Sequence, residues 1–110
     1  MSYKYDFAFE QGTTLALDIT CMDEDNAIMD LTGYSARAQL RYRYADPLPA
    51  AVFTALIVPS LGEVSLSLSP EQTSALSRKI AYWDCELASP DGIVQRLAQG
   101  RVTISPEVTK

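Results

Sequence analysis

The segment Tyr82–Ser105 reads YWDCELASPDGIVQRLAQGRVTIS and decides the fold. Before its Pro-Asp-Gly motif every second side chain is apolar, which is the period of a strand with one buried face. The motif is typical of a hairpin turn at Gly92, and the alternation resumes at the end of the segment. We therefore predict two antiparallel strands joined by this turn, with a β-bulge at Gly100.

The same alternation recurs along the chain and predicts about seven short strands, at 3–10, 13–21, 34–42, 51–58, 64–69, 80–87 and 101–105. Turn-forming residues separate them, among them Gly33. One segment departs from this period. Ser69 and Pro70 have the character of a helix N-terminus and basic residues follow, so we predict a short helix at about 70–78. The alternation places seven side chains in the core: Leu17, Ile19, Leu40, Leu66, Leu68, Trp83 and Leu87.

Short strands with frequent turns indicate an all-β protein. We predict an immunoglobulin-like antiparallel β-sandwich that forms one domain over residues 1–110. A small β-barrel is the main alternative.

Composition excludes several classes of function. The chain has no histidine, which removes the usual zinc sites and Ser-His-Asp or Cys-His catalysis. Its net charge of −5 disfavours long-range attraction to nucleic acid or anionic membranes, although a local basic face remains compatible with it. No apolar run is long enough to insert into a bilayer, and no signal peptide is visible, so we expect assembly in a cytoplasm. We expect no enzyme activity, catalytic residue, cofactor or metal.

Cys21 and Cys85 both fall on inward positions of predicted strands, so they could approach each other across the sandwich. The two alternatives are an inter-sheet disulfide and a pair of buried thiols that pack as small apolar groups. Without an export signal we favour the thiols, because cytosolic cysteines stay reduced.

An acidic loop offers Asp23, Glu24, Asp25 and Asp30 as oxygen ligands for calcium. Their spacing differs from that of a calcium-binding loop of the EF-hand type. We therefore interpret this segment as a solvated hairpin tip.

Asp84 and Glu86 lie at positions i and i+2 of one strand, with side chains roughly 6–7 Å apart on one face. A glycosidase-like pair is conceivable at this separation, but it requires a cleft and a raised pKa on one carboxyl group. The alternative is a ladder of charges across neighbouring strands, which are the third and sixth in an immunoglobulin-like sheet. This ladder, which would also suit a protein interface, comprises Arg37, Arg41, Arg43, Asp84, Glu86 and the neighbouring Tyr82.

Tyr3 and Tyr5 alternate with charged residues in the first predicted strand. This segment is either an ordinary edge strand or an N-terminal arm that adds to the sheet of a neighbouring subunit.

Three segments in this order, DLTGYSARAQLR, GEVSLSLSPEQTSAL and YWDCELASPDGIVQRLAQGRVTISPEVTK, resemble a family of small bacteriophage and prophage structural proteins. The chain is also similar to the immunoglobulin-like N-terminal domain of phage baseplate upper proteins. The resemblance extends from about Phe7 to Lys110, with Trp83 and Cys85 as departures from the family pattern. The matching positions are Asp30 to Gly33, Gln39 to Arg41, Thr73, Leu76, Asp84, Gly92, Arg96, Gly100, Val108 and Thr109.

The resemblance implies a virion component of the tail, baseplate or neck, made and assembled in the cytoplasm of the bacterial host. Its partners would be other virion proteins and further copies of itself, with no nucleic acid. The alternative function is a carbohydrate- or surface-binding module, for which Tyr3, Tyr5, Tyr42, Tyr44 and Trp83 would supply aromatic rings.

Overall fold

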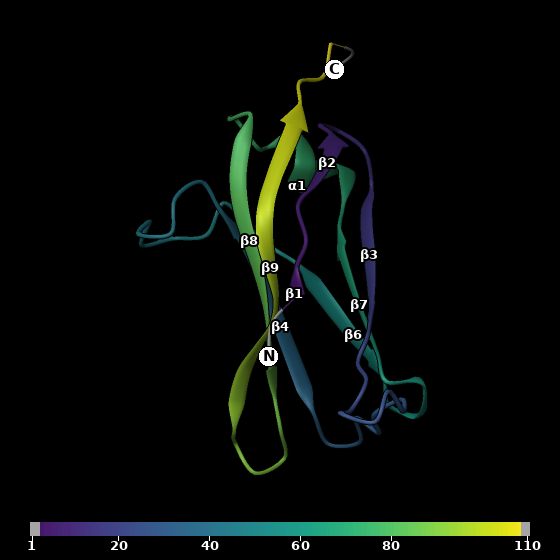
Figure 1. Cartoon of the computed structure of the whole chain (residues 1–110). Helices are drawn as coiled ribbons and strands as arrows, with labels where there is room; N and C mark the ends of the chain where they lie inside the picture. The colour runs from purple at the N-terminus through teal and green to yellow at the C-terminus, as the bar shows by residue number, and fades with distance from the viewer. Residues whose placement is uncertain (1–2, 109–110) are drawn as a thin grey trace.

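The computed structural model describes residues 3–108, which form two β-sheets packed face to face (Figure 1). One sheet contains β1 (Tyr3–Lys4), β2 (Phe7–Glu10), β4 (Ser35–Arg41), β5 (Ala51–Val52), β8 (Ile80–Ala88) and β9 (Val94–Ser105). The other contains β3 (Leu15–Thr20), β6 (Thr54–Val58) and β7 (Glu63–Leu68). A 3-10 turn, η1 (Pro59–Leu61), and one short helix, α1 (Pro70–Ser74), lie between strands.

The strand order confirms the predicted all-β sandwich. It is β1-β9-β8-β4-β5 in the first sheet, with β2 also on β9, and β3-β7-β6 in the second. The second and fifth predicted strands thus share one sheet, and the third, sixth and seventh share the other, as in immunoglobulin-like domains. The predicted strand at 51–58 divides at Phe53: β5 pairs with β4 in one sheet, whereas β6 pairs with β7 in the other.

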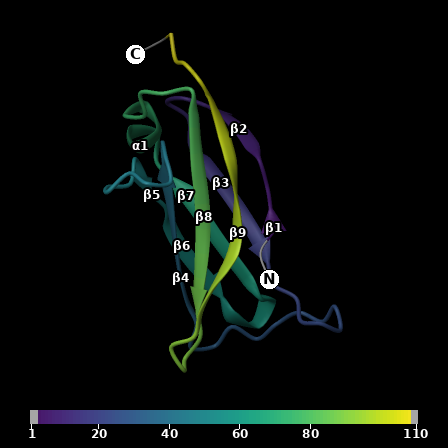
Figure 2. The ribbon, with the colours of Figure 1, turned by 60° about the vertical axis from the view of Figure 1, so that its left-hand side comes forward.

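The prediction that all strands are antiparallel is wrong for the first one. Both β1 and β2 pair with β9 in parallel (Figure 2). A tight hairpin forces its two strands to be antiparallel, but the first and last strands of the chain have no such connection.

The helix is shorter than the predicted 70–78. Ser69 caps its N-terminus in a capping box with Gln72, as the sequence indicates. The helix ends at Ser74 because Leu76 turns into the core and the side-chain amide of Gln11 binds the carbonyls of Ser74 (3.1 Å) and Leu76 (2.7 Å).

The β-bulge predicted at Gly100 lies elsewhere. The register between β8 and β9 shifts after Cys85, so that Leu97 is the extra residue, and it is buried together with its neighbour Ala98. Gly100 pairs regularly with Trp83. A side chain at this position would collide with the carbonyl group of Tyr5, which crosses directly over it. The other two predicted turn glycines, Gly33 and Gly92, have positive φ angles of 81° and 85°.

Trp83 lies at the centre of the core. Its ring is 2% exposed and makes edge contacts with Phe7 (5.6 Å between ring centroids) and Phe53 (6.3 Å). Of the seven predicted core residues, Leu17 and Ile19 are partly buried against this cluster and the other five are fully buried.

Candidate functional site

The outward side chains of β4, β8 and β9 form three rows across the first sheet. In each row β8 is flanked by β4 and β9, and Lys4 of β1 extends the middle row beside Gln99. We call this surface the charged face. Its rows are Arg41–Tyr82–Arg101, Gln39–Asp84–Gln99 with Lys4, and Arg37–Glu86–Arg96.

The charged face is basic although the chain is acidic. It contains five of the nine Lys and Arg residues and only two of the fourteen Asp and Glu residues. Its net charge is therefore +3, in a chain whose overall charge is −5. By the residues of these rows one sheet surface is basic, and the carboxylate of Asp6, which accepts from the N–H of Arg101 (2.8 Å), lies beside it.

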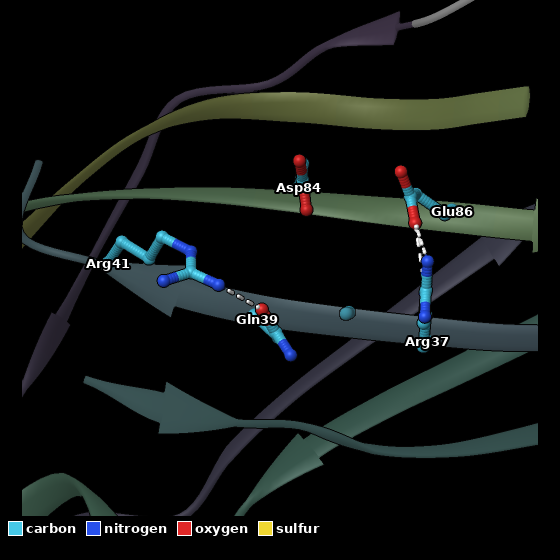
Figure 3. Close-up of a pocket in the computed structure, with 6 residues that line it drawn as sticks. Arg37, Gln39, Arg41, Asp84 and Glu86 are labelled. Atoms are coloured by element: carbon cyan, nitrogen blue, oxygen red, sulfur yellow. Dashed lines mark hydrogen bonds and ion pairs between the residues drawn. The ribbon is translucent and has the colours of Figure 1, made fainter. Parts of the chain in front are cut away.

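Arg37 and Glu86 form the cross-strand pair expected from neighbouring third and sixth strands (Figure 3). The Nε and Nη2 atoms of Arg37 both lie 2.9 Å from Oε1 of Glu86. Their side chains are 75% and 31% exposed, so water and salt screen the pair.

The ladder prediction is wrong for Arg43, which lies off the face, whereas Arg41 lies on the face but hydrogen-bonds to its own strand and loop. Arg41 donates to the carbonyl oxygen of Asp46 (2.6 Å) and to Oε1 of Gln39 (2.9 Å), as Figure 3 shows for Gln39. Arg43 lies beyond the end of β4, and its Nε is 3.5 Å from a carboxylate oxygen of Asp46. The chain turns after Arg41 into the loop 42–50, which brings Asp46 closer to both arginines than any carboxylate of β8.

Asp84 lines a hollow of about 340 Å³ in the charged face, and its closest cation is Arg96, with 3.7 Å between Oδ2 and Nε. Burial raises the pKa of Asp84; Arg96, Arg41 and Arg37 oppose this shift and Glu86 adds to it. The hollow and the raised pKa that a glycosidase-like pair requires are thus both present at Asp84, whereas Glu86 is engaged by Nε of Arg37 at 2.9 Å.

Tyr82 stacks on Tyr44 at one end of the charged face, with 4.8 Å between centroids and 29° between ring planes. Tyr44 is 70% exposed and belongs to the loop 42–50, which projects from the sandwich (Figures 1 and 2). A second hollow of about 610 Å³ lies beside this pair and is lined by Lys4, Asp6, Tyr44, Tyr82, Gln99, Gly100 and Arg101.

The other aromatic candidates are engaged within the fold. Trp83 is buried, and Tyr42 accepts a hydrogen bond from the backbone N–H of Ser77 (2.8 Å) while Arg78 lies over its ring. The rings of Tyr3 and Tyr5 are exposed, but the backbone of both residues pairs with β9 of the same chain. Tyr3 pairs with Ala98 of β9, and the N–H of Tyr5 donates to the carbonyl of Gln99 (2.8 Å).

Cys21 and Cys85 are buried thiols that form no disulfide. Burial raises the pKa of both, that of Cys85 to about 12, with smaller contributions from Cys21, Asp84 and Glu86. Buried thiols of this kind react slowly and pack as apolar side chains.

The carboxylates of the acidic loop organise its own backbone. One oxygen of Asp23 accepts hydrogen bonds from the N–H groups of Asp25 and Ala27, both at 2.9 Å. Asp30 accepts from the hydroxyl and N–H of Thr32, which lower its pKa. Within residues 3–108, no three Cys, Asp or Glu side chains gather in a metal-binding arrangement.

Sequence reasoning missed several members of the charged face: Lys4, Gln39, Arg96, Gln99 and Arg101. Arg96 and Arg101 are five positions apart, which places them on opposite faces of a regular strand. The extra residue at Leu97 brings both to one face. The sequence signal for this bulge is the pair of successive apolar residues at positions 97 and 98, which breaks the alternation.

No helix in the described part of the chain is long and apolar enough to cross a membrane. Comparison with protein-family models finds no match, and neither does comparison with curated protein sequences.

Proposed function

We propose that this chain is a non-enzymatic structural protein that acts by assembling with other proteins. On the resemblance described above, it would be a component of a phage or prophage virion in the tail, baseplate or neck, assembled in the host cytoplasm. The observation that carries the proposal is the charged face, a basic surface on a rigid sheet of an acidic protein.

An acidic protein surface fits this face better than a nucleic acid does. The carboxylates of Asp84 and Glu86 lie in the central strand, between columns of arginine on β4 and β9. A continuous row of phosphates would meet these two carboxylates, whereas a protein surface can place a cation between them and carboxylates at the periphery. Repetition of modest contacts of this kind in an assembly would give a large total affinity.

The test reverses charge on the face and follows incorporation into particles. The variant Arg96→Glu/Arg101→Glu changes two exposed side chains of β9, and Arg78→Glu/Lys79→Glu makes the same change of charge off the face. Bacteria that carry the gene with its neighbours would supply particles for antibody labelling and electron microscopy.

We expect labelled particles with the wild type and with the Arg78/Lys79 control, and at least tenfold less label with the Arg96/Arg101 variant. Particles that lack the wild-type chain would contradict a virion role. Equal labelling of all three proteins would contradict the role of the charged face.

Carbohydrate or surface binding is the second candidate, and the exposed Tyr44–Tyr82 stack beside a polar hollow favours it. Aromatic rings with adjacent polar groups suit the faces of sugars. A glycan array would show binding by the wild type that Tyr44→Ala removes. Absence of binding to every glycan would contradict this candidate.

A further inference from the structure

Strand β6 forms an open edge of the second sheet, at the end of the order β3-β7-β6 (Figure 1). Its residues pair with β7 from Thr54↔Ser67 to Val58↔Glu63. Among residues 3–108, the backbone of β6 makes no hydrogen bond other than those to β7. One row of its N–H and C=O groups is therefore free to pair with another strand.

This edge lacks the usual protection against pairing. Natural edge strands carry charges, prolines or bulges, or are covered by other elements. No charged residue occurs between Asp46 and Glu63, no proline interrupts β6, and its register with β7 is continuous.

The other edges in the described chain are protected. Asp18 lies exposed in the middle of β3, and the first strand carries Lys4 and Glu10. On β5, which has only two residues, the side-chain amide of Gln72 binds the carbonyl of Val52 (2.9 Å).

Apart from Thr54, the outer face of β6 is also apolar. Leu56 and Val58 are 65% and 38% exposed, and they alternate with the inward-facing Ala55 and Ile57. An exposed, apolar and uncharged edge strand is a site of strand addition.

We propose that β6 pairs antiparallel with β6 of a second copy of this chain, around a two-fold axis at Leu56. In this register Leu56 faces Leu56 of the second copy, and Thr54 of each copy faces Val58 of the other. Every cross-strand pair is therefore uncharged, and the contact is self-complementary. Two copies that each carry −5 repel one another over most of their surface, and this edge lets them meet without opposing like charges. The two three-stranded sheets become one continuous six-stranded sheet.

The charged face is on the other sheet and takes no part in this contact, so failure of either proposal leaves the other standing. Sedimentation equilibrium of the purified chain from about 1 µM to about 1 mM provides the test. Leu56→Lys places two like charges at the axis, on a side chain that is exposed in the monomer. Ala16→Lys adds the same charge at an exposed outer position of β3, the opposite edge of the sheet.

We expect a concentration-dependent dimer for the wild type and for Ala16→Lys, and at least a tenfold weaker dimer for Leu56→Lys. At concentrations where both chains are monomeric, the denaturation midpoint of Leu56→Lys should match that of the wild type. A mixture of the Leu56→Lys and Leu56→Glu variants should form a heterodimer, because opposite charges then meet at the axis. A wild type that stays monomeric throughout, as it would if β6 pairs only with a different protein, overturns the proposal. A dimer that Leu56→Lys leaves intact overturns it as well.

A cysteine cross-link tests the register. Because Cys21 and Cys85 are buried, Leu56→Cys introduces one exposed thiol, which lies opposite its own copy across the axis. Under mild oxidation this variant should form a disulfide-linked dimer. Thr54→Cys is the control, since residues 54 of the two copies are too far apart in this register. Equal cross-linking of both variants overturns the proposed pairing.

Discussion

The indole Nε1 of Trp83 donates a hydrogen bond of 2.8 Å to the carbonyl oxygen of Tyr5, 78 residues earlier in the chain. This bond joins the centre of the core to the first strand. It also satisfies the one polar atom that the buried indole carries. The first strand is thereby held on the sheet by a side-chain bond as well as by its parallel ladder with β9.

Trp83→Phe should loosen the first strand. The substitution removes the donor to Tyr5 and part of the buried ring, so we expect the free energy of unfolding to fall by about 1–3 kcal/mol. The amide of Tyr5, which bonds Gln99, should exchange with solvent faster. Urea denaturation and hydrogen exchange measure the two effects. Tyr5→Phe is the control, since the bond uses only the backbone of Tyr5; an equal loss in both variants would contradict this explanation.

Gly100→Ala should displace the same strand by a steric route. A Cβ at this position collides with the carbonyl group of Tyr5, a backbone group that cannot move alone. We expect a loss of about 1–3 kcal/mol, as for other overpacked sites. Limited proteolysis near Tyr5 should become faster than in the wild type. Unchanged stability and unchanged proteolysis together would show that the first strand does not cross Gly100 closely.

The alternation of side chains predicted the two-sheet sandwich and the inward positions of Leu40, Leu66 and Leu87, because a period of two is a local property of each strand. Contacts between distant segments leave no such local pattern. The sequence indicates a bulge at Gly100, but this position requires glycine because the carbonyl group of Tyr5 leaves no room for a side chain. Tyr5 lies 95 positions earlier in the chain, so no local pattern reveals this contact. The charged face was only partly predicted for the same reason: it depends on the bulge at Leu97 and on the parallel first strand.

Asp84→Asn should stabilise the protein increasingly as the pH rises. Burial raises the pKa of Asp84 in the folded chain above its ordinary value of 3.8, so the folded state holds this proton more tightly than the unfolded state does. Wild-type stability is therefore lost as the pH rises from about 3.8 through the raised folded value. The asparagine variant avoids this loss. Urea denaturation at pH 3 and pH 7 should show an advantage for the variant only at the higher pH.

Asp30→Asn should have the opposite effect on stability to Asp84→Asn. The hydrogen bonds from Thr32 lower the pKa of Asp30, so its contribution to stability is present above 3.8 and is lost as the pH falls through the folded value. The asparagine variant should be less stable than the wild type at pH 7 and match it at low pH. The same sign for both variants would contradict the assignment of Asp84 as a carboxylate that burial disfavours.

The two cysteines should resist modification in the native protein. Their pKa values are raised by burial, that of Cys85 to about 12, so few thiolates form near neutral pH. With an aromatic disulfide reagent at pH 8, we expect labelling of both thiols only at the rate at which the chain opens, and rapid labelling in urea. Because the folded pKa of Cys85 exceeds its ordinary value of 9.0, stability should also fall as the pH rises above 9.0. Rapid labelling of the folded chain would contradict burial.

Thr73→Val should be among the most destabilising single changes in the helix, although its size is conserved. The hydroxyl of the buried Thr73 accepts from the N–H of Gly12 (3.0 Å) and donates to the carbonyl of Thr13 (2.8 Å), which ties α1 to the turn before β3. Valine fills the same space but removes both hydrogen bonds, at a cost of about 1–3 kcal/mol in all. Thr73→Ser keeps the hydroxyl and loses only a methyl group, so it should remain closer to the wild type in urea denaturation. If the serine variant were the less stable of the two, packing of the methyl group rather than the hydrogen bonds would explain the burial of Thr73.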